Sequence, residues 1–302
     1  MTAKPFLKWA GGKAQLLEQF RECYPKALIT GKIHTYIEPF VGGGAVFFDI
    51  AQMYAPQKAY LYDCNEELVL AYNVIKKNPD ALIRRLKGMV KQYHACDENE
   101  RKEFFYRIRE KYNRTKKTIS CDVFSARWIT RAAQLIFLNK TCFNGLYRVN
   151  STGGFNVPFG KYRQPGVFDP QNIRAVSTLL QNAEIRCGDF TECENLVDAD
   201  TFVYFDPPYR PVSKTSSFTS YAGTGFDDNE QIRLHAFFQK LDAERGPLLM
   251  LSNSDPKNVN KHDTFFEDLY KGYSICRVYA KRSINSNAAK RGEISELVIT
   301  NY

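Results

Sequence analysis

Short apolar runs and amphipathic segments alternate near the start of the chain. Residues 34–40 and 58–62 are rich in β-branched and aromatic side chains, and these runs stop at three glycines and at Asp63, respectively. The residues that follow Gly44 have the pattern of a helix. Strand, glycine turn, helix and strand within about 30 residues are typical of a right-handed βαβ unit. We therefore expect a parallel sheet that contains these two strands.

The alternation of strand and helix returns in the C-terminal part of the chain. The pattern predicts a helix over residues 228–244 and strands over residues 184–187, 201–205, 247–252, 273–281 and 294–301. We expect the last two strands to form a closing pair. Together with the first two strands, these elements predict an α/β domain.

The middle of the chain has a different pattern. Apolar residues recur at helical spacing in two segments, at Leu82, Leu86, Met89, Val90 and Tyr93 and at Ile129, Ala132, Ala133, Ile136 and Phe137. Between Lys140 and Pro170 this periodicity is lost, and five glycines predict a turn-rich hairpin or loop. We therefore predict that residues 1–71 and 171–302 form the α/β domain and that residues 72–170 form an insert in it.

Charge also separates the middle of the chain from the rest. The 302 residues include 42 Lys and Arg against 33 Asp and Glu, which gives a formal net charge of +9. Residues 72–177 alone include 21 Lys and Arg against 8 Asp and Glu, so the remainder is mildly acidic. A solvated helix face explains any single basic run, but an asymmetry over a whole segment favours contact with a polyanion. Nucleic acid is therefore the partner that we expect for the insert.

Composition argues against several other classes of protein. No apolar run approaches the roughly 18 residues that a membrane helix needs. Lys4, Lys8 and Lys13 interrupt the apolar stretch at the N-terminus, which argues against a secretory signal. The eight cysteines contain no Cys-x-x-Cys spacing, and the four histidines have no triad or ligand spacing. We expect a cytoplasmic protein with reduced thiols, without a membrane partner and without a metal site.

A glycine turn and an acidic residue end the first two predicted strands. The glycines at 42–44 allow the backbone to approach a ligand closely. Phe47 stands where a dinucleotide-binding motif has its third glycine, and Ala14 stands where a P-loop has Ser or Thr, so neither motif fits. Asp63 is placed to accept hydrogen bonds from both hydroxyls of a ribose, although a helix N-cap is an equally good interpretation.

The most informative peptide is Asp206-Pro207-Pro208-Tyr209, which follows a predicted buried strand. The prolines lack a backbone donor and fix φ, so the carbonyl groups of Asp206 and Pro207 can point outward without a partner in a strand ladder. A carboxylate, a carbonyl and an aromatic ring this close together form a receptor for an exocyclic amine on a flat base.

Three motifs in this order resemble the Dam-type, or D12 class, DNA adenine-N6 methyltransferases. They are Lys-Trp-Ala-Gly-Gly-Lys at 8–13, Glu-Pro-Phe-Val-Gly-Gly-Gly at 38–44 and the tetrapeptide at 206–209. The similarity covers nearly the whole chain and includes residues 143–150 and 155–162. It implies a Rossmann-like class I methyltransferase fold with a mostly parallel seven-stranded sheet and a DNA-recognition insert of helices and a hairpin loop. It also implies S-adenosylmethionine as cofactor and methyl transfer to the N6 amine of an adenine flipped out of double-stranded DNA, within GATC.

The resemblance also implies roles for individual residues. The catalytic residues would be Asp206, Pro207 and Tyr209. The cofactor would be bound by Trp9, Lys13, Glu38, Phe40, Gly42, Gly44, Asp63, Asp189, Phe190 and Asp206, with Asp189 and Phe190 at its adenine. DNA would be bound by Lys8, Phe143, Asn144, Arg148, Lys161 and Ser213, with Arg148 reading a guanine. Relatives often carry Arg in place of Lys161, and some carry Tyr in place of Phe143.

Two other functions fit parts of the sequence. RNA base methyltransferases share the tetrapeptide at 206–209, and a catalytically silent DNA-binding protein can be built on the same scaffold. We favour the DNA adenine methyltransferase because the cofactor motifs and the tetrapeptide occur together, and we expect it to act as a monomer.

Overall fold

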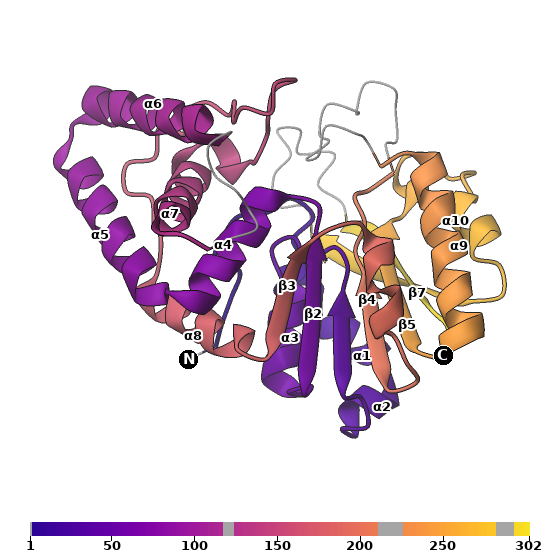
Figure 1. The fold of residues 1–302 in the computed structure, drawn as a ribbon. Helices are drawn as coiled ribbons and strands as arrows, with labels where there is room; N and C mark the ends of the chain where they lie inside the picture. Colours follow the sequence, from indigo (N-terminus) through magenta and orange to yellow (C-terminus); the bar gives the residue numbers. More distant parts are fainter. Residues whose placement is uncertain (1, 117–123, 211–225, 282–292) are drawn as a thin grey trace.

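The computed structural model describes residues 2–116, 124–210, 226–281 and 293–302. A seven-stranded sheet forms its centre, in the order β3-β2-β1-β4-β5-β7-β6 (Figure 1). The strands are β1 (Thr35–Glu38), β2 (Lys58–Asp63), β3 (Ala183–Cys187), β4 (Thr201–Phe205), β5 (Leu248–Ser254), β6 (Ser274–Lys281) and β7 (Glu293–Thr300). The five strands from β3 to β5 are parallel, whereas β7 is antiparallel to both of its neighbours. This confirms the predicted mostly parallel sheet and its closing pair of strands.

Alternate residues of the central strands pack into two separate apolar clusters, one on each face of the sheet. Tyr36 of β1 and Phe202 of β4 belong to the first cluster, whereas the next residues, Ile37 and Val203, belong to the second. Successive side chains of a strand point to opposite faces, so these strands are covered on both sides, as parallel sheets are.

Helices cover each of the two faces. The first cluster includes residues of α1 (Leu17–Cys23), α2 (Lys26–Ile29), α3 (Ala45–Met53), α4 (Glu66–Lys77) and α8 (Pro170–Leu180). The second includes residues of α9 (Asp228–Arg245), α10 (Phe265–Leu269) and the 3₁₀ segment η4 (Phe190–Leu196). Short 3₁₀ turns are η1 (Lys13–Gln15), η3 (Phe143–Gly145) and η6 (Pro256–Asn258).

Between α4 and α8, the described residues form three α-helices and a hairpin (Figure 1). The helices are α5 (Pro79–Ala95), α6 (Glu98–Thr115) and α7 (Ala126–Thr141). The hairpin follows α7 and is held by antiparallel bridges between Cys142 and Phe159 and between Val149 and Phe155. This confirms the hairpin that the loss of helical periodicity after residue 140 predicted.

The first cluster runs without interruption from the sheet into these helices. It includes Tyr93 of α5, Phe105 of α6 and Phe137 of α7, each fully buried, together with the helices that cover the sheet. The boundary that we predict at residue 72 falls inside α4, and this division into a catalytic domain and an insert stays a prediction. In the part of the chain that the structure describes, no helix is long and apolar enough to cross a membrane.

Candidate active site

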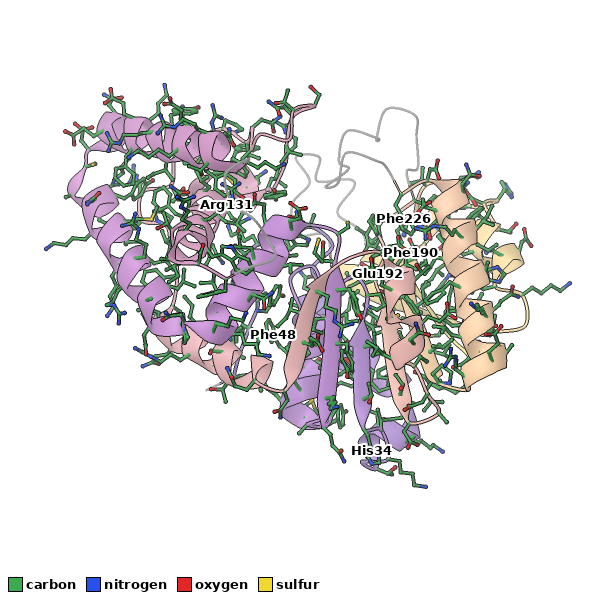
Figure 2. All side chains as sticks on the ribbon, viewed as in Figure 1. His34, Phe48, Arg131, Phe190, Glu192 and Phe226 are labelled. Carbon is green, nitrogen blue, oxygen red and sulfur yellow. The ribbon has the colours of Figure 1, made fainter. Side chains whose placement is uncertain are left out.

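The carboxyl ends of the central strands bring the predicted acidic residues together. Glu38 ends β1, Asp63 ends β2 and Asp206 follows β4, and these strands are neighbours in the sheet. Ligands of open parallel sheets bind beyond this edge. His34, by contrast, lies at the opposite end of the sheet (Figure 2).

The glycine turn after β1 is shaped by close contacts that a side chain would break. Gly42 has φ +46°, and a Cβ there would lie 3.0 Å from Cδ1 of Trp9. Gly44 has φ +70°, and a Cβ there would lie 2.5 Å from the Tyr72 hydroxyl. That hydroxyl donates a hydrogen bond to the carbonyl of Gly42, 3.1 Å away. The left-handed backbone and the close packing both require glycine.

Asp63 holds this turn in place. Its Oδ2 accepts a hydrogen bond from the backbone N–H of Gly42 at 3.0 Å, and its Oδ1 accepts one from Asn65 at 2.9 Å. Burial raises the pKa of the Asp63 carboxyl to about 6. The alternative interpretation of Asp63 as the N-cap of the next helix is wrong, because Asn65 caps α4 through the N–H groups of Glu67 and Leu68.

Glu38 is the most deeply buried of the three acids. Its side chain is 2% exposed, and its Oε2 accepts a hydrogen bond from the Tyr36 hydroxyl at 2.7 Å. Burial raises the pKa of Glu38 well above its ordinary value, and the Tyr36 hydrogen bond partly opposes this shift.

The turn after β3 adds an acid and an aromatic group. Asp189 is the N-cap of η4 and forms a two-pronged ion pair with Arg233, whose guanidinium lowers the pKa of Asp189 to about 2. The Arg233 guanidinium also lies 4.1 Å from the ring centre of Phe190. Phe190 packs against Phe40 and Phe226, so the two predicted adenine-binding residues stand beside an aromatic cluster (Figure 2).

Lys13 is the centre of the network around the tetrapeptide. Its ammonium group lies 2.7 Å from Oδ1 of Asp206, 2.9 Å from the Tyr209 hydroxyl and 3.6 Å from Oε2 of Glu296. Lys13 is only 2% exposed. Burial alone would lower its pKa, but the surrounding negative charges raise the pKa above the ordinary value. Burial raises the pKa of Asp206, and the Lys13 charge opposes that shift.

Residues from distant strands and helices brace the same tetrapeptide. The Ser252 hydroxyl donates to Asp206 at 3.2 Å, and the Tyr209 hydroxyl donates to Oε1 of Glu296 at 2.7 Å. The Gln231 amide donates to the carbonyl of Pro208 at 3.1 Å. None of the residues that the structure describes donates a hydrogen bond to the carbonyl of Pro207 or to Oδ2 of Asp206. Within the described part of the chain, these two adjacent acceptors thus have no donor.

The predicted site residues did not include Ser252, Gln231 or Glu296. Ser252 and Gln231 stand in segments that otherwise have an ordinary strand or helix pattern. Glu296 gave a weak signal, because it is a charged residue within the apolar run that predicted the last strand. A charge inside a buried strand requires a partner, and here the partner is Lys13.

The predicted DNA-binding residues of the hairpin are exposed. Phe143 is 52% exposed, and Asn144 next to it adopts a left-handed backbone with φ +56°. Arg148 is exposed and donates through Nε to Asn156 Oδ1 at 2.8 Å. Lys161 is exposed, also with a positive φ of +54°. Ser213 lies outside the described residues.

The N-terminal motif contacts the base of this hairpin. The Lys8 backbone exchanges two hydrogen bonds with the Asn139 side chain, which also donates to the carbonyl of Gly145. A Cβ at Gly145 would overlap the Lys8 side chain. Trp9 stacks on Tyr147 with ring centres 5.4 Å apart. The motif at 8–13 therefore joins the glycine turn and Asp206 to the hairpin.

No group of three or more side chains that could hold a metal ion occurs among the described residues. The described residues offer two hydrogen-bond acceptors at Asp206 and Pro207 and a buried cation at Lys13. The hairpin adds exposed aromatic and basic side chains.

Comparison with known proteins agrees with this geometry. The chain is 52% identical to the type II methyltransferase M.MjaIII of Methanocaldococcus jannaschii, with all of both chains covered. It is 38% identical to the type II methyltransferase M1.LlaDCHI of Lactococcus lactis subsp. cremoris, covering 100% of this chain and 96% of that protein. It is 34% identical to the DNA adenine methylase of Vibrio cholerae, covering 98% and 95%. The model of the D12 class N6 adenine-specific DNA methyltransferases matches residues 9–284, so the chain belongs to this family of enzymes.

Proposed function

We propose that this enzyme transfers a methyl group from S-adenosylmethionine to the N6 amine of an adenine that has been flipped out of duplex DNA, within GATC. The observation that carries this proposal is the pair of available acceptors at Asp206 and Pro207, beside the buried ammonium of Lys13. We further propose that the protein acts as a monomer, in the cytoplasm, where it meets DNA.

The residues at the carboxyl ends of the strands suit the cofactor. The turn at 42–44 has no side chains, and Asp63 keeps acceptor capacity for a ribose beside the two backbone N–H groups that it already binds. Phe40 is partly exposed and packs on the buried Phe190, so its ring offers an apolar surface for a flat base. S-adenosylmethionine would supply a methyl group attached to a positively charged sulfur, and the acidic side chains of Asp206 and Glu38 would be the groups nearest to that charge.

Asp206 and Pro207 would activate the adenine amine. The lone pair of this amine is delocalised into the ring, so the amine is a poor nucleophile. The two N–H groups of the amine would donate hydrogen bonds, one to the Asp206 carboxylate and one to the Pro207 carbonyl. These bonds would localise the lone pair and direct it at the methyl group. Lys13 favours the ionised form of Asp206 and so keeps it an acceptor.

Tyr209 would cover one face of the extruded base. The residue is 36% exposed, while its hydroxyl is fixed by Lys13 and Glu296. A ring fixed at its outer atom can accept a base on its face without a large loss of side-chain entropy. Base extrusion costs a few kcal/mol, and contacts of the basic segment with phosphates would offset that cost.

The exposed hairpin would read the DNA sequence. Phe143 is free to fill the gap that the extruded base leaves, and the guanidinium of Arg148 is exposed for a two-pronged contact with O6 and N7 of guanine. Lys161 and Lys8 would supply positive charge at a phosphate or base edge. The asparagine partner of Arg148 fixes the guanidinium without neutralising it.

Methyl incorporation tests this proposal directly. Purified protein with labelled S-adenosylmethionine should methylate duplex DNA that contains GATC, at adenine N6, and modified-base sequencing of a host that expresses the protein should give the same site. Methylation of structured RNA in preference to duplex DNA would contradict the proposed substrate. Methylation of adenine in another sequence would contradict GATC alone.

A further inference from the structure

An open basic pocket lies on the helices of the middle segment, separate from the hairpin. Its volume is about 340 Å³, and α5, α6 and α7 each contribute to its wall. Its lining includes four basic residues and no Asp or Glu. These four are Arg84, Arg85, Arg107 and Lys111. None of them forms an ion pair with a carboxylate in the described part of the chain.

The two sides of α6 serve different purposes. Arg109 donates to the carbonyl of Val157 in the hairpin, and Arg101 donates to the carbonyl of Arg163 just after it, so both hold this segment against the helix. Arg107 and Lys111 each lie about 160° around the helix from Arg109 and line the pocket instead. The pocket therefore does not face the surface that presents Phe143 and Arg148.

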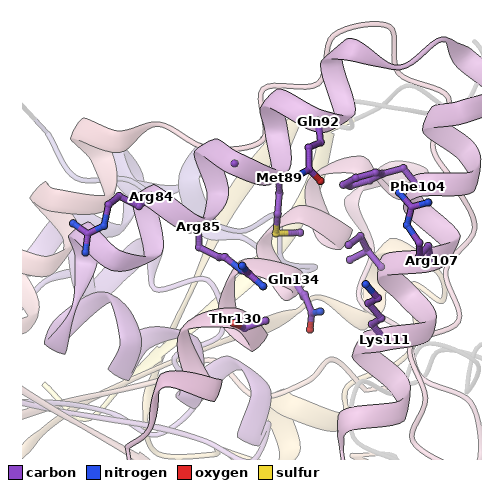
Figure 3. A pocket seen from close by; sticks show the side chains of 11 residues that line it. Arg84, Arg85, Met89, Gln92, Phe104, Arg107, Lys111, Thr130 and Gln134 are labelled. Carbon is purple, nitrogen blue, oxygen red and sulfur yellow. The ribbon is translucent and has the colours of Figure 1, made fainter.

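Two of the four basic side chains reach into the pocket from opposite walls. They are Arg85 of α5 and Lys111 of α6, with Gln134 of α7 between them and Thr130 of α7 below Arg85 (Figure 3). Arg84 points away from this centre (Figure 3). Two cations and two neutral donors from three helices form a receptor for an oxyanion.

Gln134 adds a neutral donor to the wall of the pocket. The residue is 7% exposed, and its amide makes no hydrogen bond with any other residue that the structure describes. The amide atoms are not among the fully buried polar atoms that lack a partner, so they remain accessible from the pocket. A bound oxyanion would accept from the Gln134 amide and from both cations at once.

We propose that this pocket binds a backbone phosphate of DNA, from a stretch of duplex other than the one that the hairpin holds. The inference rests on the DNA substrate of the family. A backbone phosphate fits better than a free phosphate because the cations are exposed at a wide opening, and because the pocket lies within the most basic segment of the chain. Occupation would add affinity for long DNA without touching the methylated site.

The pocket variant for the test is Arg85→Gln with Lys111→Gln. The matched control is Lys87→Gln with Lys91→Gln, which removes the same charge from exposed positions of α5 that do not line the pocket. Each protein is titrated with a duplex that just covers the recognition sequence and with one that extends several helical turns beyond it. Methylation of the short duplex and unfolding curves show whether each variant remains folded and active.

We expect the unmodified enzyme and the control to bind the extended duplex more tightly than the short one. The pocket variant should lose most of this advantage, and the slope of its log affinity against log salt should fall by about one to two. Equal losses in the pocket variant and the control would overturn the proposal.

Inorganic phosphate separates the two sources of the anion. In the control, inorganic phosphate should compete with the extended duplex more strongly than chloride does at the same ionic strength. In the pocket variant, phosphate and chloride should compete equally. A pocket that binds inorganic phosphate but adds nothing to the affinity for the extended duplex would overturn the assignment to DNA. Failure of methylation on the short duplex would contradict the proposed function and leave the binding comparison valid.

Discussion

The tetrapeptide at 206–209 and the hairpin after α7 present their functional side chains in opposite ways. Around the tetrapeptide, Lys13, Asp206 and Glu296 are buried or half-buried and bonded to one another. On the hairpin, Phe143 and Arg148 are exposed, and their contacts are local. The two regions are nevertheless joined through Trp9 and the residues next to it.

This difference follows from what each region has to do. Activation of an amine depends on acceptors that are already oriented, and groups in a water-poor site act more strongly than groups in water. A surface that reads DNA has to remain available to bases and phosphates, so its cations must not be neutralised within the protein. Variants of the first region should therefore change turnover, and variants of the second should change DNA discrimination.

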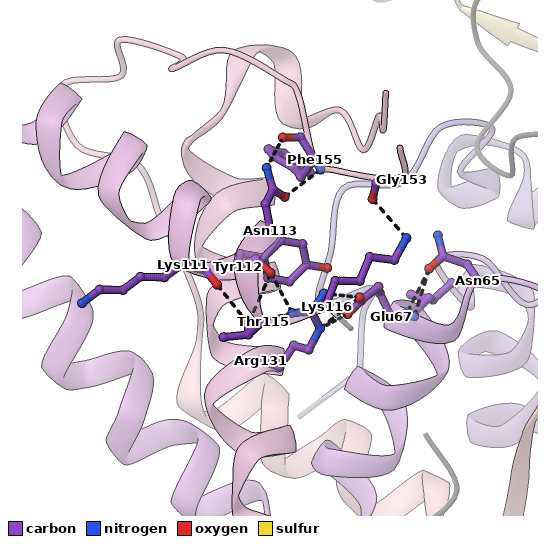
Figure 4. Close-up of polar contacts among 11 residues, drawn as sticks. Asn65, Glu67, Lys111, Tyr112, Asn113, Thr115, Lys116, Arg131, Gly153 and Phe155 are labelled. Atoms are coloured by element: carbon purple, nitrogen blue, oxygen red, sulfur yellow. Dashed lines mark hydrogen bonds and ion pairs between the residues drawn. The ribbon is translucent and has the colours of Figure 1, made fainter. Parts of the chain in front are cut away.

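One buried ion pair connects the basic helices to the sheet. Arg131 of α7 donates through Nε to both carboxylate oxygens of Glu67 on α4, and through Nη1 to the carbonyl of Tyr112 at 2.8 Å (Figure 4). Its guanidinium also lies 4.1 Å from the ring centre of Tyr112. Arg131 is 2% exposed, so this ion pair is buried like the network around the tetrapeptide, although it lies among the basic helices.

The largest effect is expected at this ion pair. Arg131→Ala should lower the free energy of unfolding by about 3–5 kcal/mol, because the Glu67 carboxylate would remain buried without a partner. Arg131→Met combined with Glu67→Leu should recover most of this loss. Chemical denaturation of the three proteins measures it. If the free energy of unfolding of Arg131→Ala lies within about 1 kcal/mol of that of the unmodified protein, the ion pair does not stabilise the contact between α7 and α4.

The next effect is expected at Asp206. Asp206→Ala should reduce turnover by about 100–1000-fold or more, since it removes one of the two acceptors for the amine. Asp206→Asn keeps an amide oxygen as acceptor but loses the negative charge, so its turnover should fall by a smaller factor. The affinity for duplex DNA should change little, because Asp206 lies among the strand ends and not on the hairpin. Single-turnover methylation and a DNA-binding titration separate the two quantities. Near-normal turnover in the Ala variant would refute the proposed role of Asp206.

Local sequence patterns were sufficient to predict most of the elements. The strand predicted over 201–205 has those bounds, and the predicted helix over 228–244 ends one residue later, at Arg245. β1 is shorter than the predicted run of 34–40 and ends at Glu38. Pro39 explains the difference, because it has no N–H to continue the ladder and the turn begins there.

Long-range partners could not be predicted from local patterns. Glu296 is far from both Lys13 and Tyr209 in the sequence, and only the order of strands brings them together. The same holds for Arg131 and Glu67, which lie on different helices. For Asp63 the sequence left a ribose acceptor and a helix N-cap equally open, and it did not single out Asn65, which caps α4.

A smaller effect is expected on the hairpin. Arg148→Ala should leave turnover on the preferred site largely intact and should reduce discrimination at one guanine by about 1–3 kcal/mol. Competition between duplexes that differ in one base pair measures this. Asn156→Ala is a useful companion, because it frees the Arg148 guanidinium without removing it and should cost less. An unchanged site preference in the Arg148 variant would remove this residue from base recognition.

The smallest effect is expected in the pH dependence of cofactor binding. The pKa of Asp63 is about 6, so the carboxylate that would accept the ribose hydroxyls is lost as the pH falls through 6. The affinity for S-adenosylmethionine should fall about tenfold between pH 7 and pH 5, where the protonated form comes to dominate. Asp189, with a pKa of about 2, stays ionised over this range and should add no slope. Titration calorimetry measures this affinity as a function of pH. The dependence on pH should become flatter in Asp63→Asn and keep its shape in Asp189→Asn. The opposite result would assign the proton to a different group of the buried site.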